Sequence, residues 1–114
     1  MTPYSPGDVV LVRFPFTDFS STKRRPAVVL SPAAYSGGYG DVVLLGLTSQ
    51  VQVEDALRLT RWQEAGLPKP TWLKPLIATV AMHVVETRLG TLANDDRATV
   101  RSALTQLIAP VFLG

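Results

Sequence analysis

The sequence predicts a mainly β protein with a C-terminal helix, an α+β fold built on a small antiparallel barrel. Three observations support this class. Short segments rich in β-branched residues follow one another along most of the chain, and turn-forming residues separate them. An apolar pattern with helical spacing occurs at the end of the chain. Successive short strands followed by one helix are typical of a small barrel or half-barrel.

The size and composition of the chain fit one domain covering residues 1–114. A length of 114 residues is close to the usual size of a single domain. Apolar residues make up 46% of the chain and charged residues only 18%, against roughly 25% charged residues in an average domain. The apolar excess indicates either a deeply wrapped barrel or a surface that another chain covers.

The first two strands are expected on either side of a long loop. The segment "GDVVLVRF" (residues 7–14) opens after a Ser-Pro-Gly turn and is rich in valine. Residues 15–25 carry Pro, Asp, Ser and Thr at turn-forming density and predict a loop. The second strand, "PAVVLS", begins at Pro26, because a strand start needs no ladder donor.

The middle of the chain predicts one central strand and several weaker ones. A glycine-rich loop is expected over residues 32–40, followed by a strand over 41–48 that is apolar on both faces. "VQV" and "ALRL" are candidate short strands, and Gly66 closes a single helical turn. Prolines allow only an edge strand over 71–74, and one or two more strands end near Gly90.

One amphipathic helix is expected to close the domain. Asn94 is its candidate cap, and Asp95 and Asp96 complement the positive end of the helix. The apolar face is formed by residues at helical spacing: Val100, Ala103, Leu104, Leu107 and Ile108.

Composition excludes several classes of function. No stretch approaches the length of a membrane span, and the N-terminus lacks the order of a secretory signal, so a soluble cytoplasmic protein without membrane contact is expected. The chain has no cysteine and one histidine, which excludes disulfides, thiolate metal sites and His-rich sites. Because the acidic residues are scattered, the sequence predicts no metal site.

Positive charge is concentrated near the start of the chain although the net charge is only +2. Such a small net charge is too weak to hold nucleic acid by bulk electrostatics. The first quarter nevertheless contains Arg13, Lys23, Arg24 and Arg25, while its only acids are Asp8 and Asp18. In "KRRPAVVLSP" three of these cations stand directly before a buried strand, where solvating charge is hardest.

Four motifs in a fixed order give the sequence a family resemblance. The segments "GDVVLVRF", "KRRPAVVLSP", "LLGLTSQ" and "AGLPKPTWLKP" together resemble the MazF/PemK family of toxin endoribonucleases, and the likeness covers essentially the whole chain. The resemblance implies an SH3-like barrel of the plasmid-toxin type, a homodimer and a cognate antitoxin. It also implies sequence-selective cleavage of single-stranded RNA without metal or cofactor.

The same resemblance suggests roles for two residues. Arg25 matches the catalytic arginine, whose planar fork can hold two phosphate oxygens while charge builds on them. Thr48, at the end of the third strand, offers a hydroxyl to the reacting phosphate or to the attacking 2′-hydroxyl. A fixed cation and a donor are what metal-free RNA cleavage requires.

Substrate-binding residues are expected around this pair. They comprise Phe16, Thr17 and Asp18 in the first loop, Lys23 and Arg24 beside Arg25, and Ser49 and Gln50 beside Thr48. Aromatic residues of a loop either stack on bases or pack inward, and loop cations either hold phosphates or are simply solvated.

The general base stays open at this point. His83 titrates near neutrality, but its setting in "AMHVV" favours a structural histidine in an apolar strand. Asp18 is the alternative acceptor or orienting group. The rival interpretations are a non-catalytic SH3-like binding module and a gyrase-directed toxin of the same fold, which lack the paired arginine and threonine.

Overall fold

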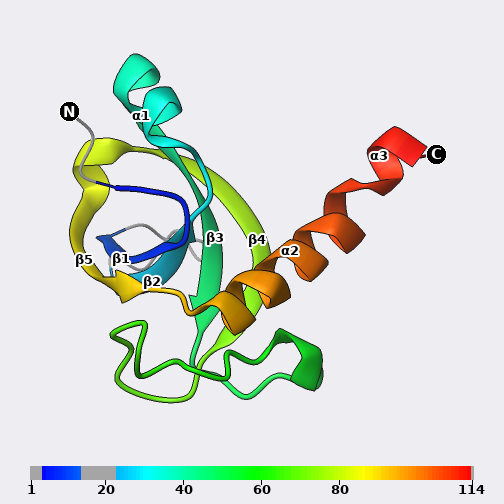
Figure 1. The fold of residues 1–114 in the computed structure, drawn as a ribbon. Coiled ribbons are helices and arrows are strands. Elements are labelled where there is room, and N and C mark those ends of the chain that lie inside the picture. The colour runs from blue at the N-terminus through cyan, green and yellow to red at the C-terminus, as the bar shows by residue number, and fades with distance from the viewer. Residues whose placement is uncertain (1–3, 14–22, 114) are drawn as a thin grey trace.

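Five antiparallel strands form one curved sheet in the order β4-β3-β2-β1-β5 (Figure 1). The computed structural model describes residues 4–13 and 23–113. The elements are β1 (Asp8–Arg13), β2 (Arg24–Val29), α1 (Ala33–Tyr39), β3 (Asp41–Thr48), the 3₁₀ helix η1 (Asp55–Leu57), β4 (Trp72–Ala81), the 3₁₀ helix η2 (Met82–Val84), β5 (Val85–Thr91), α2 (Asn94–Ile108) and α3 (Pro110–Leu113). The predicted class, mainly β with a C-terminal helix, is confirmed.

Valine-rich strands bury both faces of the sheet. Because side chains alternate along a strand, Val9 joins one buried cluster while Val10 and Val12 join another. The first cluster continues into Leu59 and Val100, and so lies between the sheet, the β3–β4 connection and α2. The β3–β4 connection and α2 thus cover the face of the sheet that carries Val9.

Strand β4 is longer than the edge strand expected from the sequence. It is an edge strand and pairs only with β3 among the strands that the structure describes, which explains how it accommodates Pro75. Its register with β3 shifts between Leu45 and Gly46, which pair with Ile77 and Lys74. This irregularity takes up the proline without ending the strand.

Two local predictions in the middle of the chain are wrong. The glycine-rich segment 32–40 contains the short helix α1, in which Tyr35 and Tyr39 stack with ring centroids 4.9 Å apart. The segments "VQV" and "ALRL" form no pair of strands; η1 lies between them and Arg58 makes only an isolated bridge to Trp72. Gly66 does end a turn, at a φ of +80°, with its N–H donating to the carbonyl of Gln63.

Helix α2 begins at Asn94, so Asn94 is not its cap. The N-cap is Ala93, and it makes no side-chain capping bond. Val100 is buried, but Leu107 and Ile108 remain exposed because the C-terminal part of α2 extends away from the sheet (Figure 1). The exposed Val111, Phe112 and Leu113 of α3 continue this apolar surface.

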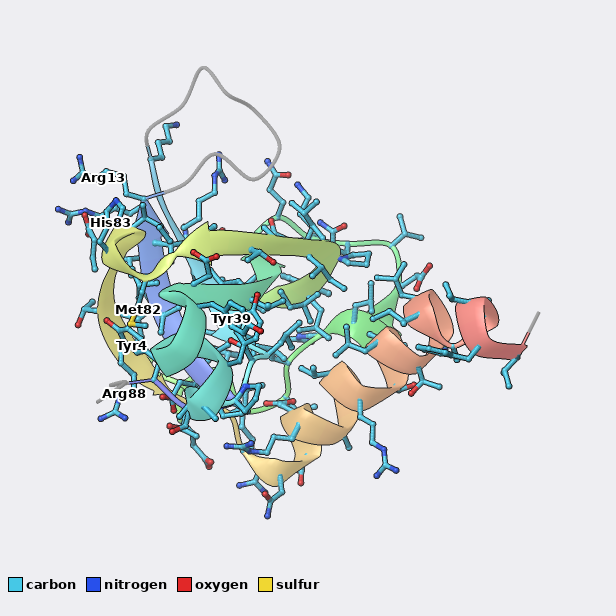
Figure 2. All side chains as sticks on the ribbon, turned by 90° about the horizontal axis from the view of Figure 1, so that it is seen from above. Tyr4, Arg13, Tyr39, Met82, His83 and Arg88 are labelled. Atoms are coloured by element: carbon cyan, nitrogen blue, oxygen red, sulfur yellow. The ribbon has the colours of Figure 1, made fainter. Side chains whose placement is uncertain are left out.

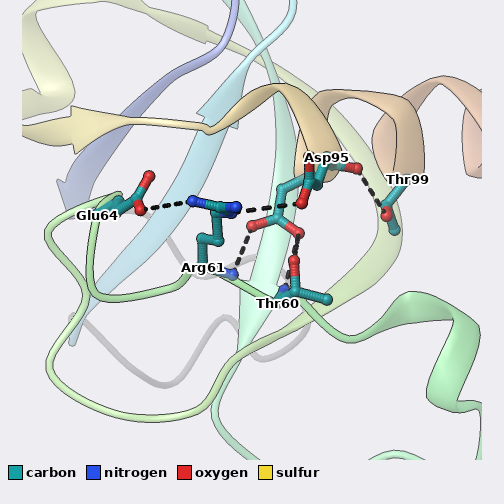
Figure 3. Close-up of polar contacts among 6 residues, drawn as sticks. Thr60, Arg61, Glu64, Asp95 and Thr99 are labelled. Atoms are coloured by element: carbon teal, nitrogen blue, oxygen red, sulfur yellow. Dashed lines mark hydrogen bonds and ion pairs between the residues drawn. The ribbon is translucent and has the colours of Figure 1, made fainter.

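The carboxylate of Asp96 joins α2 to the β3–β4 connection (Figure 3). Asp96 is fully buried and accepts bonds from the backbone N–H groups of Thr60 and Arg61, at 2.8 and 2.9 Å. The exposed Arg61 guanidinium bonds Glu64 and Asp95, and these carboxylates raise the pKa of Arg61. Asp96, in the first turn of α2, thus fixes the long β3–β4 connection, which contains no strand of its own.

Candidate functional site

A cavity of about 570 Å³ opens where β2 begins and β3 ends, next to the β3–β4 connection. Its lining residues come from five parts of the chain: Leu11, Arg24, Arg25, Pro26, Gly46, Leu47, Thr48, Ser49, Gln50, Leu67, Pro68, Lys69, Thr71, Lys74 and Leu89. The structure therefore brings together Arg25 and Thr48 with three of the expected binding residues, Arg24, Ser49 and Gln50.

Arg25 lies inside strand β2. The sequence had instead placed it at the end of the preceding loop. It pairs with Val12 of β1 and precedes Pro26, so its backbone is fixed by the ladder and by the proline ring. Its side chain is partly buried and makes no hydrogen bond or ion pair with the residues that the structure describes. Its guanidinium fork can therefore bind an anion in the cavity.

Thr48 is the last residue of β3 and is partly buried, opposite Trp72 of β4. Its hydroxyl oxygen accepts a bond of 3.1 Å from the N–H of Gln50. This bond uses a lone pair and leaves the hydroxyl proton free to be donated. Thr48 is thus oriented as a donor by the turn that follows it.

Arg24 lines the cavity, but its guanidinium is already paired. Its Nε lies 2.8 Å from Oε2 of Glu86, and the other carboxylate oxygen lies 3.1 Å from Nε of Arg13. Arg13 and Arg24 face each other across β1 and β2, where like charges repel, and Glu86 offsets this repulsion. Lys23, also expected to hold a phosphate, is exposed and outside the lining of the cavity.

Two lysines of the cavity were missed by the sequence analysis. Lys69 and Lys74 lie in "GLPKPTWLKP", which served as a family motif without any role for its lysines. The available signal was two cations placed between prolines in an otherwise apolar segment.

Other residues considered from the sequence are not among the described lining residues of the cavity. Phe16, Thr17 and Asp18 lie outside the described residues. His83 is exposed on the turn between β4 and β5, so the expectation of a structural histidine in an apolar strand is wrong (Figure 2). Trp72 is buried, and its Nε1 has no hydrogen-bond partner within residues 4–13 and 23–113. The guanidinium carbon of Arg58 lies 5.7 Å from the centroid of its ring.

The cavity is strongly positive. Four cations line it, namely Arg24, Arg25, Lys69 and Lys74, and no acid appears among its described lining residues. Over residues 4–13 and 23–113, no group of three or more His, Asp or Glu side chains is placed to hold a metal ion. This arrangement can bind a polyanion, place a guanidinium on it and donate a proton from a hydroxyl.

None of the helices in the described part of the chain has the length and apolar character needed to cross a bilayer.

Solved structures with the same fold confirm the toxin-like architecture. MazF of Deinococcus radiodurans in a MazE–MazF crystal is 28% identical, with a TM-score of 0.74 over 93% of this chain and 96% of that one. A second MazF structure from this organism is 27% identical, with a TM-score of 0.72 over 96% and 98% of the two chains. An endoribonuclease bound to its cognate antitoxin, from a mycobacterial species, shares the fold at 16% identity, with a TM-score of 0.73 over 93% and 95%.

A search of curated proteins gave no match. The family model of PemK-like, MazF-like toxins matches residues 5–108, which include every described residue of the cavity. This chain therefore belongs to the PemK-like, MazF-like toxins of type II toxin–antitoxin systems.

Proposed function

We propose that this toxin is an endoribonuclease that cleaves single-stranded RNA without a metal ion and thereby inhibits translation and growth. One observation carries the proposal: Arg25, unpaired among the described residues, and the oriented hydroxyl of Thr48 line the same cationic cavity. A gyrase-directed toxin or a binding module would not need these two groups together.

The chemistry follows from what this pair can supply. The ribose 2′-oxygen attacks the adjacent phosphorus, so the O2′–P bond forms and the P–O5′ bond breaks. A general base or water takes the proton from O2′, and the leaving O5′ gains a proton. Negative charge grows on the non-bridging oxygens during this step. The guanidinium of Arg25 holds two of these oxygens, and the hydroxyl of Thr48 donates to the same phosphate.

The remaining binding groups fall into two sets. Ser49 and Gln50 are exposed beside Thr48 and can bond an RNA base or ribose. We assign base contacts to Phe16, Thr17 and Asp18 as well, on the basis of the family resemblance. Discrimination among RNA sequences then comes from these loop residues, while Arg25 and Thr48 act on any phosphate.

Partners follow from the relatives and from the surface. The Deinococcus MazF was crystallised with MazE, and we propose that a cognate antitoxin blocks the cavity of this toxin in the cytoplasm. We also propose that residues 1–114 act as one toxin domain and form a homodimer. The exposed apolar residues of α2 and α3 support self-association.

The test is a cleavage assay in which product ends are mapped. The purified protein is incubated with a panel of single-stranded RNAs of mixed sequence. We expect cleavage that leaves 2′,3′-cyclic phosphate and 5′-hydroxyl ends, because the 2′-oxygen is the attacking atom. Products with 3′-hydroxyl and 5′-phosphate ends would overturn the mechanism, and intact RNA throughout would favour the binding module.

A further inference from the structure

We propose that Lys69 and Lys74, and not Arg24, hold the RNA backbone beside the scissile phosphate. The cavity would then grip RNA from one wall, formed by the β3–β4 connection and the start of β4. This inference rests on the proposed function, because it concerns the same cavity. It adds which of the four cations in the lining bind the RNA backbone.

On the β2 wall, Arg24 is paired with Glu86, whose single carboxylate it shares with Arg13. Thr87 and Val85 pair with consecutive residues of β1, so Glu86 between them is the extra residue of an irregularity in the β1–β5 ladder. Its carboxylate is thereby placed across the ends of β1 and β2, 2.8 Å from Nε of Arg24. A phosphate has to compete with this carboxylate before Arg24 can contribute to binding.

On the other wall, the backbone around Lys69 is fixed before any ligand binds. Pro68 and Pro70 flank the lysine and restrict the chain to extended conformations. The hydroxyl of Thr71, which is only 2% exposed, donates to the carbonyl of Lys69 at 2.8 Å. On the N-terminal side, the backbone N–H of the buried Leu67 donates to the carbonyl oxygen of Trp62. The lysine is thus held at the cavity by anchors on both sides.

Lys74 lies at the cavity opposite a glycine of the neighbouring strand. Gly46 pairs with Lys74, and both residues line the cavity. A Cβ on Gly46 would lie 3.5 Å from the carbonyl oxygen and 3.6 Å from the Cβ of Lys74. A glycine at this position places no side chain between the stem of Lys74 and the cavity that both residues line.

The two lysines also differ from Arg24 in their charge partners. Neither makes an ion pair or hydrogen bond through its ammonium group with the described residues. Their charge is therefore balanced by solvent ions, and RNA phosphates that replace these ions make binding depend on salt. Arg24, which is partly compensated by the Glu86 carboxylate, contributes less to that dependence than either lysine.

The experiment measures RNA affinity and its salt dependence in the full chain. The probe is a fluorescent single-stranded RNA of mixed sequence with 2′-O-methyl riboses, which the toxin cannot cleave, followed by anisotropy from low to moderate salt. The variants Lys69→Gln, Lys74→Gln and Arg24→Gln each remove one charge. Arg101→Gln, on the exposed side of α2 and away from this cavity, is the matched control.

We expect each lysine variant to weaken binding roughly threefold to tenfold and to reduce the log–log salt slope by about 0.7. Arg24→Gln should weaken binding and reduce the slope clearly less than either lysine variant, and the control should leave both nearly unchanged. Lys69→Arg, which keeps the charge, should retain the wild-type slope. Glu86→Gln should tighten binding and steepen the slope, because it frees Arg24.

Two results would overturn the inference, and they are distinguishable. If the wild type binds the RNA but the lysine variants keep its affinity and slope, the assignment of the two lysines is wrong while the proposed function stands. If the wild type fails to bind both this probe and unmodified RNA, the proposed function fails together with the inference. Thermal unfolding of each variant establishes that the fold is intact.

Discussion

The buried carboxylate of Asp96 accepts hydrogen bonds from both the backbone N–H and the hydroxyl of Thr60, at 2.8 and 3.0 Å. The two residues are 36 positions apart, so this contact joins α2 to the connection between β3 and β4 (Figure 3). That connection supplies one wall of the cavity, from Ser49 to Thr71. The position of Lys69 therefore depends on an acid far from it in the sequence.

Asp96→Ala should destabilise the protein by about 2–4 kcal/mol, because the backbone N–H groups of Thr60 and Arg61 lose their acceptor in a buried setting. Asp96→Asn should cost less, since one amide oxygen remains as an acceptor. Urea unfolding of the full chain measures both. Asp95→Ala, which removes an exposed acid from the same helical turn, is the control, and an equal loss for the two alanine variants would contradict the assignment.

Arg25→Ala should lower the rate of RNA cleavage on the order of 100-fold or more while the domain stays folded. Its side chain makes no polar contact with the described residues, so truncating it breaks none of the polar contacts seen there. Arg25→Lys should fail nearly as badly, because a point charge cannot bind two oxygens in the geometry of the fork. Single-turnover cleavage of RNA measures the rates, and wild-type cleavage by the alanine variant would remove Arg25 from the mechanism.

Thr48→Val should reduce the cleavage rate roughly 10- to 100-fold, because it keeps the shape of the side chain and removes the donor. Thr48→Ser should recover most of the rate, since the serine hydroxyl can still accept from the N–H of Gln50 and donate to the phosphate. Affinity for the 2′-O-methyl probe should change little in either variant. A valine variant that loses binding and keeps its cleavage rate at saturating RNA would show that Thr48 only positions the strand.

The strands of the sheet were largely predictable because their apolar residues carry a local signal. "GDVVLVRF" and "DVVLLGLT" have the β-branched content of buried strands, and both form strands within a residue or two of the expected bounds. The helix over 94–108 followed from its apolar spacing. The glycines of α1 and the capping role of Asn94 misled the prediction, because Gly and Asn have strong local preferences that the surrounding structure overrode.

The site was predictable only in part. Arg25, Thr48, Ser49 and Gln50 line one cavity, as the motifs indicated, although whether they act on RNA stays a prediction. The pairing of Arg24 with Glu86 joins residues 62 positions apart through an irregularity in the sheet, and no local pattern carries that information. Lys69 was missed because its local sequence, a lysine between two prolines, is typical of a solvated loop. Only the fold places it at the cavity.

The toxin should be a dimer in solution at micromolar concentration, because an apolar surface continues from Leu107 to the end of α3. Phe112→Asp should weaken the dimer by placing a charge on this surface. Tyr39→Asp is the control, since Tyr39 is a similarly exposed aromatic residue on α1, 74% against 79% for Phe112. Light scattering over a dilution series measures the mass, and a wild-type monomer at every concentration would contradict the proposal.

Cleavage of single-stranded RNA should survive excess chelator and should not extend to DNA of the same sequence. Sites that work through divalent ions need clustered carboxylates, whereas the cavity is lined by cations and no acid among its described residues. In the proposed mechanism Arg25 supplies the charge that a metal would otherwise supply, and DNA lacks the attacking 2′-hydroxyl. One assay with matched RNA and DNA, each with chelator and with added magnesium, measures both points. Cleavage that requires magnesium, or equal cleavage of the DNA, would show that Arg25 and Thr48 do not form the reacting site, even though the fold and the family stand.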